Sequence, residues 1–234
     1  MATALHAAEL DAVFSYAGRT AAPVAQPLPT RIGGFGGVQG LEAYIRAHAI
    51  SHVIDATHPF AAQISRNAIA ACDATQTPLI VLQRPAWVAG PQDQWCHVDD
   101  TTAAVNALPS TPARVFLAIG KQTLEAFAAK SQHHYLLRLV DAPDGPLPLP
   151  DCTVVIERGP FTVAGDTALM IRHGITHIVA KNAGGTGAQA KLEAARALRL
   201  PVILIGRPDL TTRRIVHDVA QVMDWLFHHA RLGV

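Results

Sequence analysis

Residues 175–208, ITHIVAKNAGGTGAQAKLEAARALRLPVILIGRP, decide the fold class of this chain. A short apolar run, a glycine-rich segment, an Ala-rich run and a second apolar run predict a strand, a loop, a helix and a strand. Residues 50–85, ISHVIDATHPFAAQISRNAIAACDATQTPLIVLQRP, repeat this order and also end in Arg-Pro. In a parallel sheet the loops after such strands open on the carboxyl edge, where open α/β proteins bind ligands. The repeat predicts two similar domains that face each other across a cleft.

Other parts of the chain continue the alternation of strands and helices. Short runs rich in Val, Ile and Leu predict buried strands, at residues 12–15, 52–56, 79–82, 114–119, 135–140, 153–156, 177–180 and 202–205. Ala-rich segments with helical spacing predict helices at residues 38–49, 61–75, 121–130, 163–173 and 188–198. An apolar stripe predicts a closing helix over residues 211–231. This order favours parallel strands joined by right-handed crossovers.

The fold class expected from this order is α/β, with two Rossmann-like parallel-sheet domains. A second strand-helix series begins just after the Pro-rich connector at residues 108–112. We therefore expect an N-terminal domain over residues 1–109 and a C-terminal domain over residues 110–234. The first domain begins with a helical piece at residues 2–9 and no strand before it, so its first strand is expected to be missing.

Composition narrows the functional class. Half of the 234 residues are hydrophobic, 16% are charged and the formal net charge is +1, so no strong field recruits nucleic acid or a membrane surface. The three cysteines lack zinc-site spacing, and their odd number fits reduced thiols in the cytoplasm. No apolar run reaches the roughly 18 residues of a membrane helix. We expect a cytoplasmic protein that binds a small molecule.

Two motifs near the N-terminus are typical of nucleotide binding. Ser15-Tyr16-Ala17-Gly18-Arg19-Thr20 follows a predicted strand, at the place where an Arg accommodates the 2′-phosphate of NADP. An ordinary surface arginine on a turn explains Arg19 equally well. Gly33-Gly34-Phe35-Gly36-Gly37 precedes a helix, and glycines there let a ligand approach backbone N–H groups. A flexible loop is the alternative.

Two loops of the repeat carry polar side chains. Asp55-Ala56-Thr57-His58-Pro59-Phe60-Ala61 lies between a strand and a helix, so Thr57 and His58 are expected to face the cleft. Asp55 acts as an acid, a ligand anchor or a cap, and His58 is either a proton donor or a structural histidine. Lys181-Asn182-Ala183-Gly184-Gly185-Thr186-Gly187 is the equivalent loop, expected to bind a phosphate or carboxylate.

Three further positions are expected on the same edge. Glu157-Arg158-Gly159-Pro160-Phe161 ends a predicted strand and forms either a salt-bridged turn or a ligand contact. Arg84 and Arg207 close the repeated strands, where they bind anionic groups or brace the sheet. The chain has no H-E-x-x-H and no G-x-S-x-G motif, which disfavours metal and serine-nucleophile chemistry.

Taken in order, six segments resemble the precorrin-6A reductases of cobalamin biosynthesis. They are residues 17–20, 31–37, 55–61, 84–87, 157–161 and 181–185. The combination of D-A-T-H-P-F-A with G-G-F-G-G is specific. The resemblance implies two Rossmann-like domains with the active site between them, and NADPH-dependent reduction of one double bond of precorrin-6A, giving precorrin-6B. It also implies an opening strand and a G-G-T-x-E-A turn that this sequence lacks, and thus a truncated or mis-started chain.

The resemblance gives the motif residues their expected roles. The cofactor-binding residues are Ser15, Gly18, Arg19, Thr20, Gly33, Gly34, Phe35 and Gly36, and His58 is the candidate proton donor. The substrate or cleft residues are Asp55, Thr57, Phe60, Arg84, Glu157, Lys181, Asn182, Gly184, Gly185 and Arg207. The expected partner is precorrin-6A or cobalt-precorrin-6A. The alternative is a non-catalytic dinucleotide- or tetrapyrrole-binding protein.

Overall fold

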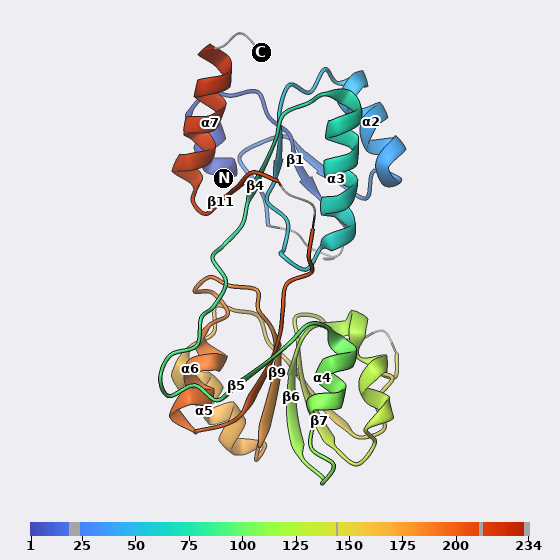
Figure 1. The fold of residues 1–234 in the computed structure, drawn as a ribbon, viewed down its shortest axis with the longest axis vertical. Coiled ribbons are helices and arrows are strands. Elements are labelled where there is room, and N and C mark those ends of the chain that lie inside the picture. Colours follow the sequence, from blue (N-terminus) through green and yellow to red (C-terminus); the bar gives the residue numbers. More distant parts are fainter. Residues whose placement is uncertain (19–23, 144, 211–212, 232–234) are drawn as a thin grey trace. The chain divides into compact units, whose positions relative to one another are not determined.

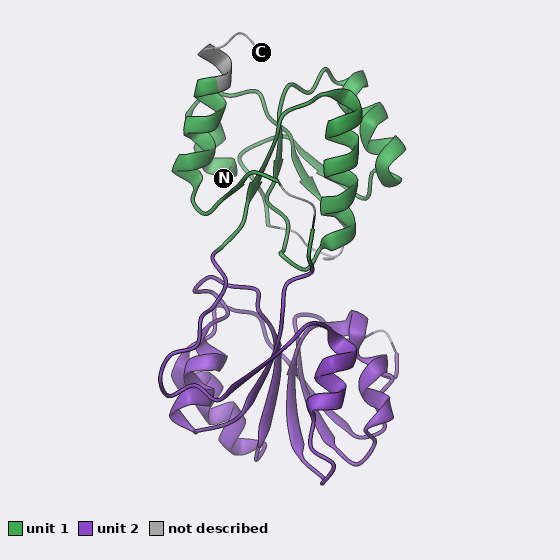
Figure 2. Ribbon diagram, in the orientation of Figure 1, with its two compact units in different colours: residues 1–84, 209–234 green, residues 85–208 purple. Residues whose placement is uncertain are grey.

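The chain forms two compact units (Figures 1 and 2). A computed structural model describes residues 1–18, 24–143, 145–210 and 213–231. Unit 1 contains residues 1–84 and 209–234, and unit 2 contains residues 85–208. The chain passes between the units twice, after residue 84 and after residue 208, and the boundary expected near Pro109 coincides with neither place. The reason is that residues 95–98 join the sheet of unit 2, whereas residues 215–216 return to a sheet of unit 1.

Unit 1 holds two small parallel sheets. Its strands are β1 (Phe14–Tyr16), β2 (Thr30–Ile32), β3 (Val53–Asp55), β4 (Leu79–Leu82) and β11 (Ile215–Val216). β1 pairs with β2, and the other three lie in the order β11-β4-β3. Among the described residues no hydrogen-bonded strand pair joins the two sheets. The carboxyl ends of β3, β4 and β11 share one edge because all three strands run in parallel.

Four helices complete unit 1. They are α1 (Ala2–Ala7), α2 (Gly37–Ala47), α3 (Ala62–Thr75) and α7 (Val219–Arg231). α2 packs against α3, and α1 packs against α7 (Figure 1). Leu41 and Ile45 of α2 meet Ala68, Ala71 and Cys72 of α3 in a buried cluster, which gives each helix one apolar face. Unit 1 is therefore layered, with strands between two helix pairs.

Unit 2 is built on one six-stranded parallel sheet. Its strands are β5 (Trp95–Val98), β6 (Arg114–Ala118), β7 (His134–Leu139), β8 (Cys152–Ile156), β9 (His177–Lys181) and β10 (Val202–Ile205), in the order β5-β10-β9-β6-β7-β8. The α-helices are α4 (Thr101–Ala107), α5 (Val163–Arg172) and α6 (Ala190–Ala197). α5 packs against α6, and α4 packs against a short 3-10 helix. The chain order reverses between β6 and β9, and such a switch point is where open α/β sheets bind ligands.

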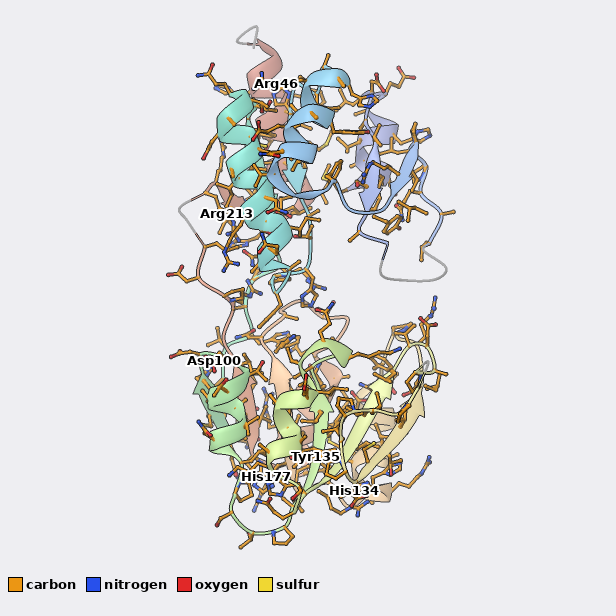
Figure 3. The ribbon with its side chains drawn as sticks, turned by 90° about the vertical axis from the view of Figure 1, so that its right-hand side faces the viewer. Arg46, Asp100, His134, Tyr135, His177 and Arg213 are labelled. Carbon is orange, nitrogen blue, oxygen red and sulfur yellow. The ribbon has the colours of Figure 1, made fainter. Side chains whose placement is uncertain are left out.

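Three side-chain labels in Figure 3 identify the amino edge of the unit 2 sheet. His134 and Tyr135 begin β7, and His177 begins β9. Asp100 follows β5 at the carboxyl edge, where its Oδ1 accepts the Ala103 N–H at 2.8 Å and caps α4. Among the described residues no helix is long and apolar enough to cross a membrane.

The α/β class, the parallel pairing and the repeat are confirmed. β3-α3-β4 and β9-α6-β10 are each a strand, a helix and an adjacent parallel strand. Two expected helices were wrong. Residues 121–130 form 3-10 turns at Lys121–Thr123 and Glu125–Ala129 instead of an α-helix. Residues 211–231 contain strand β11 before α7, because Ile215 and Val216 complete the sheet beside β4.

Candidate active site

Arg31 organises the carboxyl edge of the β1-β2 sheet. It faces Ser15 across the strand pair, and its guanidinium donates to Ser15 Oγ at 3.3 Å. The same group donates to the carbonyl oxygens of Gly33 at 2.5 Å and Gly34 at 2.7 Å. Sequence reasoning gave Arg31 no role. It holds three of the expected cofactor residues in one place.

The ring of Phe35, in the glycine loop, packs against two other side chains. The Arg31 guanidinium lies 3.8 Å from the centre of its ring, and Tyr44 of α2 meets the ring edge-on at 5.1 Å. The Phe35 carbonyl approaches Gly40 so closely that a Cβ there would overlap it. Gly40 is therefore needed for the loop to pack on α2, although no motif singled it out.

The glycines of this edge fit a ligand that approaches the backbone. Gly18, Gly33 and Gly36 have positive φ values of 76°, 118° and 82°. A Cβ built on Gly33, Gly34 or Gly36 would meet no atom within 4 Å, so side chains at these positions would occupy space that is open here. Arg19 and Thr20 lie outside the described residues. The described part of this edge thus leaves open space beside the glycine backbone.

Asp55 shapes the loop that follows β3. Its side chain is buried, and Oδ1 accepts the Thr57 N–H at 3.0 Å and the Thr57 hydroxyl at 2.6 Å. Oδ2 accepts the Ser65 hydroxyl of α3 at 2.6 Å. These bonds tie the loop to the helix that it precedes. Asp55 was expected to be an acid, a ligand anchor or a cap, and the bonds that it makes here hold the loop and α3 together.

A pocket of about 460 Å³ opens at the carboxyl ends of β3, β4 and β11. It brings together three expected residues, Thr57, His58 and Arg84. His217, Asp218 and Val219 form its other wall. The sequence analysis missed them because residues 211–231 were expected to be one helix. The rule that ligands bind after parallel strands would have found His217 if Ile215 and Val216 had been identified as a strand.

Both imidazoles of this pocket are held by the backbone. Nδ1 of His58 accepts the Phe60 N–H at 3.2 Å, and the centres of the His58 and Phe60 rings lie 5.9 Å apart. Nδ1 of His217 lies 2.7 Å from the carbonyl oxygen of Gln83. Asp218 Oδ1 accepts the Gln221 N–H at 2.8 Å near the start of α7. Phe60 thus contacts His58 through both its backbone N–H and its ring.

The equivalent loop of unit 2 is bound to its own unit. The buried Asn182 amide accepts the Trp87 N–H at 2.8 Å and donates to the Trp87 carbonyl at 3.0 Å. The Trp87 indole donates to the Gly185 carbonyl at 2.8 Å. A Cβ on Gly184 would overlap the Pro85 carbonyl. The expected ligand residues Asn182, Gly184 and Gly185 thus make internal contacts.

Arg207 and Lys181 differ in their surroundings. Arg207 donates to the carbonyl oxygens of Asn182 at 2.9 Å and Ala183 at 3.2 Å, so it braces the loop. Lys181 ends β9 beside the switch point, and partial burial lowers the pKa of its amine. The helix after this loop starts at Ala190, whereas the sequence predicted a start at residue 188.

Glu157 belongs to an ion-pair cluster around Arg138 of β7. The Arg138 guanidinium is 3.4 Å from Glu157 and pairs more closely with the buried Asp166 of α5. It also lies 3.5 Å from the centre of the Phe161 ring. The salt-bridged turn considered for residues 157–161 is therefore present. Arg138, which carries the cluster, was not identified from the sequence.

Lys191 is the buried cation of unit 2 that no motif indicated. Its side chain donates to the Ala188 carbonyl at 2.5 Å and lies 5.0 Å from the centre of the Trp87 ring. Burial, with a smaller contribution from Arg138, lowers the pKa of its amine to about 8. Within the described residues no group of three or more His, Cys, Asp or Glu side chains is arranged to hold a metal ion.

Parallel sheets with a glycine loop and a polar pocket at their carboxyl edges define a Rossmann-like α/β protein. Residues 1–227 match the family described as precorrin-6x reductase CbiJ/CobK. The chain belongs to this family. It is 65% identical over 219 residues to precorrin-6A reductase from Rhodobacter capsulatus, covering 94% of this chain and 87% of the relative.

A more distant relative and a solved structure agree with this assignment. Cobalt-precorrin-6A reductase from Priestia megaterium is 31% identical over 198 residues, covering 80% of this chain and 77% of that protein. The solved structure named CobK precorrin-6A reductase superposes with a TM-score of 0.94 at 63% identity. It covers 97% of this chain, and 91% of that chain is covered. The family resemblance noted in the sequence is confirmed.

Proposed function

We propose that this protein reduces one double bond of precorrin-6A to give precorrin-6B, with NADPH as the reductant. The observation that carries the proposal is the identity of 65% to a precorrin-6A reductase over 94% of this chain. The resemblance of the motifs to that family supports the same substrate. The finding on membrane spans and the reduced cysteines fit our expectation of a cytoplasmic enzyme.

The edge of β1-β2 is the proposed NADPH site. Ser15, Arg19 and Thr20 are proposed to hold the 2′-phosphate, and Gly18, Gly33, Gly34, Phe35 and Gly36 to shape the rest of the site. The open space above the glycines and the positive φ values support this assignment. NADPH, when bound, supplies the hydride. The protein's part is orientation and placement of charge.

The substrate is proposed to meet polar groups at the carboxyl edges of the sheets. A precorrin carries many carboxylates, which need cations and N–H donors. Arg84 and Lys181 are the proposed cationic contacts, at the ends of β4 and β9. Asp55, Asn182, Gly184 and Arg207 act through the loop shape, because their contacts are internal. The pocket with Thr57 and His58 is the proposed source of the proton, and His58 is the candidate that the sequence names.

Anaerobic turnover tests the proposal. The purified chain is mixed with NADPH and either precorrin-6A or cobalt-precorrin-6A. We expect loss of nicotinamide absorbance together with a product that has gained two hydrogens by mass spectrometry. Repeating the assay with NADH tests the choice of cofactor. Binding of NADPH or tetrapyrrole without any oxidation of NADPH would contradict the proposal and support the non-catalytic alternative.

A further inference from the structure

His217 has a fixed ring orientation at the wall of the unit 1 pocket. Its Nδ1 lies 2.7 Å from the Gln83 carbonyl oxygen, and a carbonyl oxygen only accepts hydrogen bonds. Nδ1 must therefore carry a hydrogen. In the neutral ring this leaves the lone pair on Nε2, and in the cation both nitrogens carry hydrogens. The hydrogen bond to Gln83 is thus compatible with both charge states of His217.

His58 has the opposite arrangement. Its Nδ1 accepts the Phe60 N–H at 3.2 Å, so this nitrogen needs its lone pair. The hydrogen of the neutral ring then lies on Nε2. Adding a second hydrogen at Nδ1 would break the bond to Phe60. The two imidazoles of one pocket therefore differ, because His217 exchanges a proton without losing its anchor and His58 does not.

The backbone of His217 is fixed as well. Its N–H donates to Gln221 Oε1 at 3.0 Å, while the Gln221 N–H donates to Asp218 Oδ1 at 2.8 Å. This reciprocal pair resembles a capping box at the start of α7. A proton donor must be held within a few tenths of an ångström of its productive place, and such a cap provides that restraint. Gln221 is accordingly a positioning residue.

We propose that His217 donates the proton in the reduction, through its Nε2–H. The inference rests on the proposed function. One end of the substrate double bond receives a hydride with its electron pair from the reduced nicotinamide. The π electron pair moves to the other end, which takes the proton from Nε2. The products are the substrate with two added hydrogens, oxidised nicotinamide and neutral His217, which water reprotonates.

The charges around His217 are suited to this step. The titratable or charged side chains that line the pocket are His58, Arg84 and Asp218. They come from the loop after β3, the end of β4 and the start of α7. Asp218 follows His217 in the chain, and the Arg84 guanidinium attracts anionic substrate groups. The proposed donor thus lies in a pocket that attracts carboxylates.

The first test needs no turnover. Nitrogen-15 NMR of the uniformly labelled 234-residue chain, assigned with the H217N variant, reports the tautomer of His217. We expect the Nδ1–H form when the ring is neutral. The opposite tautomer would overturn the proposal, because the Gln83 carbonyl would then not hold Nδ1–H.

The second test compares rates of a single turnover with NADPH and precorrin-6A. H217N keeps an amide N–H near the position of Nδ1 but cannot deliver a proton. We expect a rate about 10²- to 10³-fold lower than that of the wild type, as for a lost general acid. The fall of the wild-type rate at high pH should disappear in H217N. NADPH affinity should change less than threefold.

Two variants separate the possible outcomes. H6N alters an exposed histidine of α1 outside the pocket and should keep the wild-type rate. H58N should keep the fall of the rate at high pH, because His217 is intact. An H217N variant with the wild-type rate and pH profile overturns the proposal alone. No turnover by the wild type overturns the proposed function and the proposal together. If H217N does not fold, Q221A takes its place, and we expect a lower rate at unchanged NADPH affinity.

Discussion

The two loops at equivalent positions in the repeat have different surroundings. After β3, the loop leaves Thr57 and His58 at the wall of a pocket. After β9, the Asn182 amide and the Gly185 carbonyl bond to Trp87, and Arg207 bonds to the loop carbonyls. Equivalent loops in a repeat therefore need not make the same contacts. The loop after β9 is fixed by residues far along the chain in unit 2, whereas the loop after β3 is fixed mainly by its own residues and by Ser65 of α3.

The largest expected effect on this comparison is the loss of stability on replacing Asn182. N182A leaves the buried Trp87 N–H and carbonyl without their amide partner. We expect the free energy of unfolding of unit 2 to fall by about 2–4 kcal/mol, measured by chemical denaturation. N106A, on the exposed face of α4, should change it by less than about 0.5 kcal/mol. Equal losses in the two variants would show that the amide bonds contribute little.

The next effect is the pH dependence of stability at Lys191. Burial lowers its folded pKa from 10.5 to about 8, so the folded state disfavours the charged amine. The contribution of Lys191 to the free energy of unfolding is therefore lowest below pH 8. It rises between pH 8 and 10.5 and reaches its full value above pH 10.5. The rise should amount to at most about 3 kcal/mol. Chemical denaturation at pH values across this window should show the rise in the wild type and in the control variant K121M, and should not show it in K191M.

At the edge of the β1-β2 sheet in unit 1 we expect the opposite of the effects in unit 2. Replacing Arg19 should affect ligand binding more than stability. R19A should weaken NADPH binding by about 1.5–3 kcal/mol, as for a lost charge-assisted contact, and leave NADH nearly unchanged. Fluorescence titration with both cofactors measures this. R66A, at an exposed position of α3, is the matched control. An equal loss for NADPH and NADH would mean that Arg19 does not read the phosphate.

The smallest effect is expected at Lys181, the loop residue of unit 2 for which we propose ligand contact. K181A should raise the KM for the tetrapyrrole about three- to tenfold, up to about 1.4 kcal/mol, at an unchanged melting temperature. Steady-state kinetics and a thermal melt decide this. A large fall in melting temperature with unchanged kinetics would place Lys181 among the structural residues of its loop.

The strands that sequence reasoning missed share one physical property. β2, β5 and β11 each lie at the edge of a sheet and have exposed residues, as in the pattern of Trp95, Cys96, His97 and Val98. The edge strands β3 and β8 carry apolar runs and were predicted, whereas β2, β5 and β11 contain no apolar run of four residues to detect. The central strands were predictable because both of their faces are covered. Because β11 was not predicted, His217, which directly follows it, was not identified as a pocket residue.

The sequence by itself determined the class of fold, the repeated strand-helix-strand unit and the family, because burial requires apolar runs and the motifs are local. It also located Thr57, His58 and Arg84 at the carboxyl ends of strands, where one pocket opens. Only the tertiary structure decided that Asn182 binds Trp87, that Arg31 holds the glycine loop, and that His217 joins His58 in one pocket. These depend on residues far apart in the chain, such as Gln83 and His217, whose pairing follows from strand order and leaves no local pattern.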